Sequence, residues 1–265
     1  MNPLELLYEP DLEAWELPGA LAELYPGTLG FAGPTLYVNF VETLDGIVAV
    51  PGLPRSNALV ADESDADRFV MALLRACADV VVIGAGTLLS SPGGTWRADR
   101  AYPPAAGALA ELRAARGLPE HPALAVVTAG GSFDPRHPVL ERGALVLTTR
   151  SAAADIRASV PSATEVVAVG GEDSVDPAAA LAALHERGHE LVLSESGPTL
   201  FGALLASRLV DELFLTVSPL LAGRAADPRL ALVEGVELLP GTRAAGELRS
   251  VRRGGSHLFL RYRLS

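Results

Sequence analysis

Residues 190–208, with the sequence ELVLSESGPTLFGALLASR, decide the fold. A short apolar run at 191–193 ends in a polar turn, and an apolar pattern with a period of about 3.6 residues follows the turn. This order predicts a strand, a tight turn and a helix that begins at Pro198, where a missing N–H costs nothing. Gly197 allows close approach to the backbone, and a helix start attracts anions. The turn is therefore either an anion site or an ordinary connection.

A carboxylate stands beside this turn. Glu195 lies two residues before Gly197, at the carboxyl end of the expected strand. In open α/β sheets, ligands bind at the edge formed by the carboxyl ends of the strands. If the turn holds an anion, Glu195 is therefore placed next to the bound ligand.

Strands and helices alternate along most of the chain. Besides 191–193, we expect strands at 36–41, 80–83, 123–128, 144–148, 166–169 and 212–217, and helices ending near 77, 116 and 187. This alternation predicts an α/β fold with a mostly parallel central sheet and helices on both faces. Two alternating runs, 249–253 and 257–263, flank Gly254-Gly255 and predict a C-terminal antiparallel hairpin. The helix that ends near residue 77 takes Asp62 or Ser64 as its N-cap.

The chain divides into an extension and one domain. Residues 1–34 are interrupted by prolines but carry several apolar side chains, so they are too apolar for a disordered tail. We expect this extension to pack on the body or on a partner subunit. No shift in composition separates the remainder, and residues 35–265 are predicted to form a single domain.

Composition excludes several classes of function. The net charge of −11 disfavours nucleic acid or an anionic membrane as the main partner. The single cysteine provides no disulfide framework, and the five histidines show no metal-ligand spacing. No apolar run approaches the roughly 20 residues of a membrane helix, and the N-terminus has no secretory signal. A cytoplasmic protein without a metal centre is predicted.

Three further sequence features have both a functional and a plain reading. Gly84-Ala85-Gly86-Thr87 follows a buried strand and indicates either a phosphate contact or a tight turn, since the third glycine of a dinucleotide fingerprint is absent. Asp45-Gly46 is either part of a site or a β-turn. Arg150 follows a strand, where an arginine can bind a ribose 2′-phosphate, but a solvated arginine on a loop is the more common case.

Taken in order, the motifs resemble one known family. They are ETLDG at 42–46, GAGTL at 84–88, ESGPTL at 195–200, LVDEL at 209–213 and SPLLAG at 218–223. Over roughly residues 35–263 the chain resembles the reductase domain of bacterial riboflavin biosynthesis, which is the C-terminal half of a bifunctional deaminase–reductase. The resemblance implies a standalone form of that reductase with a dihydrofolate reductase-like fold.

The resemblance implies an NADPH-dependent reductase, often a homodimer, that reduces the ribose of a phosphorylated aminouracil ribosylamine at C1′. Glu195 is the expected catalytic residue, steering or protonating the ribosylamine. The expected cofactor-binding residues lie in the two glycine turns and at the ends of neighbouring strands. They are Glu42, Gly84, Gly86, Thr87, Thr128, Arg150, Ser196, Gly197, Pro198, Thr199 and Leu200. The expected substrate-binding residues are Asn39, Asp45, Ser56, Arg75, Arg97 and Glu195.

The substrate side departs from the family pattern more than the cofactor side does. Asn39 stands where the family commonly has a lysine, and Ser90-Ser91 replace a pair of acids. Changed polar groups alter which ligand groups find a partner, and unpaired buried groups are costly. The motifs expected to bind NADPH are thus kept, whereas those expected to bind the riboflavin substrate are altered. Two alternatives stay open, namely a reductase of dihydrofolate or another pterin, and an NADP(H)-binding protein without turnover.

Overall fold

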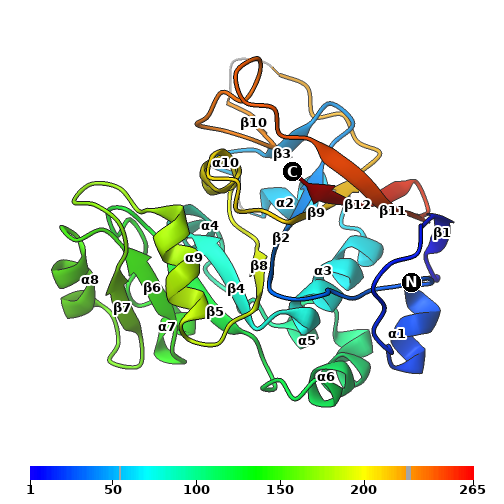
Figure 1. Cartoon of the computed structure of the whole chain (residues 1–265), viewed down its shortest axis with the longest axis horizontal. Coiled ribbons are helices and arrows are strands. Elements are labelled where there is room, and N and C mark those ends of the chain that lie inside the picture. Colours follow the sequence, from blue (N-terminus) through cyan, green and yellow to red (C-terminus); the bar gives the residue numbers. More distant parts are fainter. Residues whose placement is uncertain (54, 225–227) are drawn as a thin grey trace.

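The computed structural model describes residues 1–53, 55–224 and 228–265. Its centre is a ten-stranded sheet with the strand order β1-β11-β12-β9-β2-β8-β4-β5-β6-β7 (Figure 1). The strands of this sheet are β1 (Glu5–Tyr8), β2 (Thr35–Glu42), β4 (Val80–Gly84), β5 (Ala123–Val127), β6 (Leu145–Thr148), β7 (Glu165–Ala168), β8 (Leu191–Ser194), β9 (Glu212–Val217), β11 (Gly246–Gly254) and β12 (His257–Leu264). A second, two-stranded sheet pairs β3 (Ile47–Ala49) with β10 (Leu230–Ala231).

The large sheet is mostly parallel. All pairs from β9 through β2, β8, β4, β5 and β6 to β7 are parallel. The hairpin β11–β12 adds to β9 in the antiparallel sense, and β1 pairs with β11 at the edge of the sheet. The predicted α/β class with a C-terminal antiparallel hairpin is confirmed. The edge strand β1 was not predicted.

Helices cover both faces of the sheet. They are α1 (Gly19–Leu24), α2 (Ser56–Val60), α3 (Asp65–Cys77), α4 (Ala85–Ser90), α5 (Ala98–Ala101), the 3₁₀ turn η1 (Pro103–Ala105), α6 (Ala106–Ala115), α7 (Pro138–Glu141), α8 (Ala153–Ser159), α9 (Pro177–His185) and α10 (Pro198–Ala206). In β4, Val81 and Ile83 join the core beneath α3 and α6, whereas Val80 and Val82 join the core beneath α9 and α10. The prediction of a central strand buried on both faces is thus confirmed, because successive side chains of a strand point to opposite faces.

Helix α3 shows why these residues form a helix. The Ser64 side chain accepts a hydrogen bond from the backbone N–H of Asp67 at 3.3 Å, which confirms Ser64 as the N-cap. Asp65 and Asp67 lie in the first turn, where carboxylates interact favourably with the helix dipole. Phe69 and Leu73 are fully buried against the sheet. The opposite side of the helix is left free to face the cavity described below.

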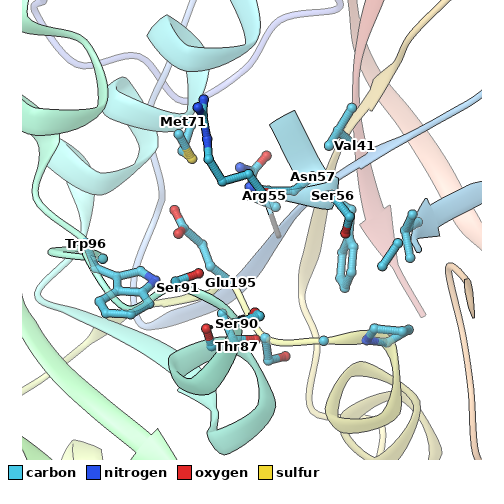
Figure 2. Close-up of a pocket in the computed structure, with 18 of the residues that line it drawn as sticks. Val41, Arg55, Ser56, Asn57, Met71, Thr87, Ser90, Ser91, Trp96 and Glu195 are labelled. Carbon is cyan, nitrogen blue, oxygen red and sulfur yellow. Dashed lines mark hydrogen bonds between the residues drawn. The ribbon is translucent and has the colours of Figure 1, made fainter. Parts of the chain in front are cut away.

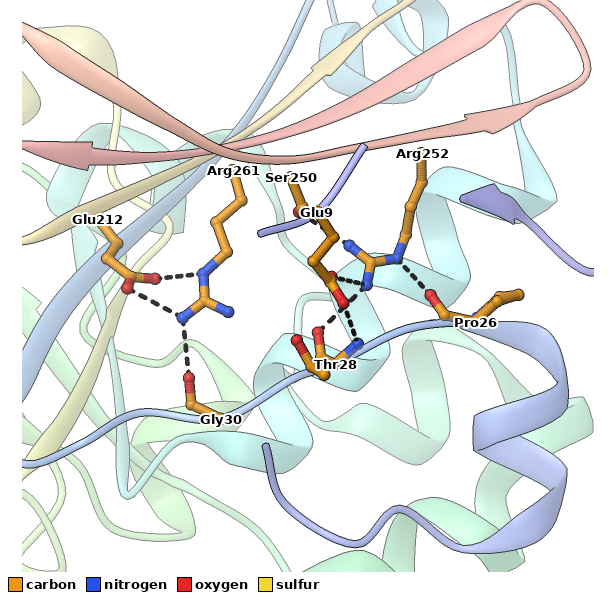
Figure 3. A network of polar contacts seen from close by, with 8 residues as sticks. All are labelled: Glu9, Pro26, Thr28, Gly30, Glu212, Ser250, Arg252 and Arg261. Atoms are coloured by element: carbon orange, nitrogen blue, oxygen red, sulfur yellow. Dashed lines mark hydrogen bonds and ion pairs between the residues drawn. The ribbon is translucent and has the colours of Figure 1, made fainter. Parts of the chain in front are cut away.

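The N-terminal segment lies against the sheet and the helices beside it. Leu21 and Leu29 are fully buried in the core. The Arg252 guanidinium, on β11, donates to the Glu9 carboxylate at 2.6 Å and to the backbone carbonyl of Pro26 at 2.9 Å (Figure 3). These contacts tie residues 1–34 to the end of the sheet. Among the described residues, no helix is long and apolar enough to cross a bilayer.

Candidate active site

The carboxyl ends of β2, β8 and β4 lie at one edge of the sheet, because the three strands are parallel neighbours. A cavity of about 280 Å³ opens at this edge. Its walls come from the end of β2, from β3, the segment into α2, one face of α3, the segment from α4 to residue 96, and the turn between β8 and α10. Figure 2 shows the Glu195 side chain extending into the space between Trp96 and Ser56. This is the position in which ligands bind to open α/β sheets.

The turn from β8 to α10 forms the floor of the cavity. The Glu195 N–H donates to the Val82 carbonyl at 2.9 Å, and the hydroxyls of Ser194 and Ser196 lie 2.8 Å apart. Gly197 is the N-cap of α10, and no side chain among the described residues accepts a hydrogen bond from the first turn. Its φ of −70° is open to any residue, and an added Cβ would meet no atom within 4 Å. Neither backbone strain nor packing requires glycine here, which leaves room for a ligand at the helix start.

A second glycine-containing turn joins β4 to α4. Gly84 is the last residue of β4, and a Cβ added at Gly84 or at Gly86 would also meet nothing within 4 Å. Thr87 lines the cavity, and its carbonyl accepts a hydrogen bond from the Ser90 hydroxyl at 3.1 Å. The two turns thus form adjoining surfaces of backbone that a ligand can approach closely.

Glu195 is paired with Arg75. The Arg75 Nε donates to Oε1 at 2.8 Å and Nη2 donates to Oε2 at 2.6 Å, and about nine-tenths of each side chain is buried. This bidentate arrangement is the strongest geometry for an arginine–carboxylate pair. The sequence analysis expected Arg75 and Glu195 to bind substrate. The structure brings them into direct contact although they are 120 residues apart.

The structure adds a carboxyl group that the sequence analysis did not identify. Asp67 lies on α3, with Met71 and Arg75 one and two turns further along, and all three side chains line the cavity. Burial raises the pKa of Asp67 to about 6, against the opposing effects of the Thr216 hydroxyl and His257. The four-residue spacing of 67, 71 and 75 was the available signal, because such residues share one helix face.

The cavity gathers eight of the residues that the sequence analysis assigned to cofactor or substrate. They are Asn39, Ser56, Arg75, Thr87, Glu195, Ser196, Gly197 and Pro198. The others lie outside its lining, and their roles stay predictions. These are Glu42, Asp45, Gly84, Gly86, Arg97, Thr128, Arg150, Thr199 and Leu200.

Asp45, one of the residues outside the lining, anchors a loop. A hydrogen bond from Thr43 and the backbone N–H groups of Ala222 and Gly223 lower the pKa of Asp45 to about 2. The carboxylate thereby holds the 220–223 segment beside the end of β2. The Leu44 N–H adds a further contact by donating to the carbonyl of residue 220.

Three other residues outside the lining have partners of their own. Arg97 forms two hydrogen bonds of 3.0 Å with Asp99. Thr128, which follows β5, accepts a hydrogen bond from the Gly131 N–H at 2.9 Å. Arg150, which follows β6, is largely exposed and pairs with a glutamate of the 169–175 loop at 3.2 Å. Thr128 and Arg150 lie at the same edge of the sheet as the cavity, because β5 and β6 run parallel to β4.

Comparison with known proteins supplies relatives in sequence and in structure. The family described as the RibD C-terminal domain matches residues 34–258. The 2,5-diamino-6-ribosylamino-4(3H)-pyrimidinone 5′-phosphate reductase of Archaeoglobus fulgidus is 28% identical over 192 residues, which cover 72% of this chain and 82% of that protein.

The solved structures establish the fold. A pyrimidine reductase-like protein from Corynebacterium diphtheriae superposes with a TM-score of 0.72 at 20% identity, over 88% of this chain and 92% of that one. The riboflavin biosynthesis reductase of Saccharomyces cerevisiae superposes with a TM-score of 0.56 at 16% identity, over 94% of this chain and 95% of that one. The deaminase–reductase of Thermotoga maritima gives 0.62 at 18% identity, and the match covers 88% of this chain but only 57% of that longer one.

Proposed function

Because the chain belongs to the RibD C-terminal domain family, we propose that it is a reductase acting on the ribosyl group of a 6-ribosylaminopyrimidine 5′-phosphate. The relatives are named as reductases of such compounds, with a 2,5-diamino-4(3H)-pyrimidinone base in one and an aminouracil base in another. One observation supports the proposal above the others. Arg75 and Glu195, which are 120 residues apart in the sequence, pair in the same cavity that contains the glycine turn before α10, at the carboxyl edge of the sheet.

Membership of this reductase family implies a nicotinamide cofactor, and we propose NADPH. The cofactor would supply a hydride. The open space at Gly197, Gly84 and Gly86 and the uncapped first turn of α10 suit a pyrophosphate, which binds well to free N–H groups at a helix start. In this arrangement 196–200 hold the pyrophosphate, and Arg150 lies at the sheet edge where it would meet a 2′-phosphate. Glu42, Thr87 and Thr128 complete the proposed cofactor contacts.

The surroundings of the cavity suit a phosphorylated substrate. A wider groove of about 980 Å³ adjoins the cavity and shares Asp67, Met71 and Arg75 with it. Five arginines line this groove against three carboxylates, although the whole chain carries a net charge of −11. They are Arg55, Arg68, Arg75, Arg100 and Arg142. Arg55, Arg68 and Arg75 already pair with carboxylates. A phosphate would therefore be attracted mainly by Arg100 and Arg142, against the field of the whole protein.

The Glu195–Arg75 pair has a clear place in the proposed reaction. Reduction at C1′ requires the ribose ring to open to a neutral imine. Positive charge builds on C1′ and its nitrogen while the ring C–O bond breaks, before the nitrogen proton passes to the released ring oxygen. A carboxylate that is already oriented stabilises that charge without reorganising during the reaction. We propose that Glu195 steers and stabilises the substrate in this way and that Arg75 fixes its orientation.

The proposal is tested by binding and by turnover. NADPH should raise the melting temperature, since a ligand that binds only the folded state stabilises it. NADPH oxidation is then followed with the diaminopyrimidinone ribosylamine 5′-phosphate, with the aminouracil analogue and with dihydrofolate. Turnover of either ribosylamine is expected. Faster turnover of dihydrofolate would refute the proposed substrate, and NADPH binding without any turnover would favour a binding protein.

A further inference from the structure

Two carboxyl groups among the described residues line the cavity, and their surroundings differ. Glu195 lies at the end of β8, and Asp67 lies on α3. The mechanism proposed above uses only Glu195. When an active site holds two carboxyl groups in unlike surroundings, the surroundings assign one to act as an acid and the other to remain ionised.

The geometry engages both carboxylate oxygens of Glu195 as acceptors. Each of its two oxygens accepts a hydrogen bond from the Arg75 guanidinium, at 2.8 and 2.6 Å. A proton on Glu195 would replace one of these charge-assisted bonds and leave the buried arginine charge without its full partner, which is costly. Glu195 is therefore poorly suited to give up a proton in each catalytic cycle.

Asp67 has the opposite surroundings. Burial, together with the charge of Glu195, favours its protonated form, whereas the Thr216 hydroxyl on β9, His257 on β12 and Arg68 on its own helix favour the ionised form. Burial dominates, so the pKa of Asp67 lies at about 6. A general acid works best when its pKa is near the working pH.

The described part of the cavity wall offers few other ionisable side chains. Apart from the two carboxyl groups, the ionisable side chains in the described lining are Arg55 and Arg75, which do not release protons at neutral pH. The chain contains no lysine, and Asn39, which also lines the cavity, carries a neutral amide. Of the ionisable side chains in the described lining, Asp67 is the carboxyl group that is not held in a bidentate pair with an arginine.

We propose that Asp67 is the proton donor of the reaction. The inference rests on the proposed function. As the hydride forms the new bond at C1′, the electron pair of the C=N double bond moves to the nitrogen, which takes its proton from the Asp67 carboxyl group. Asp67 is left as a carboxylate and regains a proton from water before the next cycle. The substrate gains a hydride and a proton, so the atoms and charges of an imine-to-amine reduction balance.

Asp67→Asn tests the inference, because the amide preserves the shape of the side chain but cannot donate as an acid. We expect kcat to fall by about 10²-fold, the lower end of what a positioned acid contributes. The kcat/KM of the wild type should fall as pH rises through about 6, since the acid must be protonated in the free enzyme, and this dependence should vanish in Asp67→Asn. In Glu195→Gln the fall in activity with rising pH should persist but occur at lower pH, because a negative charge that raises the pKa of Asp67 is removed.

Asp62→Asn is the matched control. Asp62 lies in the turn before α3 and outside the cavity lining, so this variant should leave kcat and the pH dependence of kcat/KM unchanged.

Two readouts do not depend on turnover. The dissociation constant of NADPH, measured by fluorescence, should be the same for wild type and Asp67→Asn, which also shows that the variant is folded. A carboxyl ¹³C NMR titration of the wild type, assigned by the signal lost in Asp67→Asn, should give a pKa that matches the fall in kcat/KM, because both report the free enzyme. Wild-type kcat in the variant, or a mismatch between these two pKa values, would overturn the role of Asp67. A wild type that turns over neither ribosylamine would instead overturn the proposed function itself.

Discussion

Gly197→Val is the variant that separates the cofactor site from the fold. A valine Cβ at this position would meet no protein atom within 4 Å, and the φ of −70° and ψ of 167° lie in the extended region that valine prefers. The folded protein should therefore accept the change. Its only expected cost in the absence of ligand is the weaker N-cap preference of valine relative to glycine, on the order of 1 kcal/mol or less.

The expected loss is in NADPH affinity. The added side chain occupies the space through which a pyrophosphate would reach the first N–H groups of α10. Losing one hydrogen bond to a charged group costs about 1.5–3 kcal/mol. At about 1.4 kcal/mol for each factor of ten, the dissociation constant should rise by roughly 10- to 150-fold. NADPH fluorescence titration measures this rise, and thermal unfolding without ligand checks the fold.

Two other glycines provide controls. Gly107, in α6, also has no atom within 4 Å of an added Cβ and lies outside the cavity, so Gly107→Val should leave NADPH affinity unchanged. A Cβ added at Gly202, in α10 itself, would clash with the Glu234 carbonyl oxygen, so Gly202→Ala should lower the melting temperature clearly. Wild-type NADPH affinity in a folded Gly197→Val protein would show that the pyrophosphate does not bind at this helix start.

Three further substitutions test other parts of the structure. Glu195→Gln should lower kcat by about 10²-fold, as expected when one oriented electrostatic group is lost, while NADPH affinity stays nearly constant; an unchanged kcat would remove Glu195 from the mechanism. Arg150→Ala should reduce the preference for NADPH over NADH by about fivefold, because an exposed ion pair contributes up to about 1 kcal/mol; an equal ratio would assign the 2′-phosphate to another residue. Arg252→Leu leaves the Glu9 carboxylate buried without its partner and should cost about 3–5 kcal/mol in urea unfolding; wild-type stability would show that this contact does not hold the N-terminal segment.

Much of the fold was accessible from local pattern. Continuous apolar runs such as 80–83 predicted strands buried on both faces, and these strands take the expected places in the sheet. The periodic segment before Cys77 predicted α3 with its N-cap. Gly254-Gly255 predicted the hairpin of β11 and β12. In these cases the residues that determine each element are close together in sequence, so hydrophobic periodicity and turn chemistry are sufficient.

The edge strand β1 shows where local pattern fails. Its four residues, 5–8, are all exposed, and its hydrogen-bonding partner is β11, more than 200 residues away. A strand that buries no side chain has little hydrophobic signal of its own. It exists because β11 presents an unpaired edge, which is a property of the assembled sheet.

The sequence by itself determined the family, the α/β class and the two glycine turns, because a motif of a few adjacent residues carries each of them. Only the tertiary structure decided how the carboxyl groups divide their roles. Arg75 could engage Glu195 only after the sheet had placed α3 beside the end of β8. The pKa of Asp67 likewise depends on burial, on a hydrogen bond from Thr216 on β9, and on the charges of His257 on β12 and of Glu195. Electrostatic character comes from distance and desolvation, and both are set when remote segments pack together.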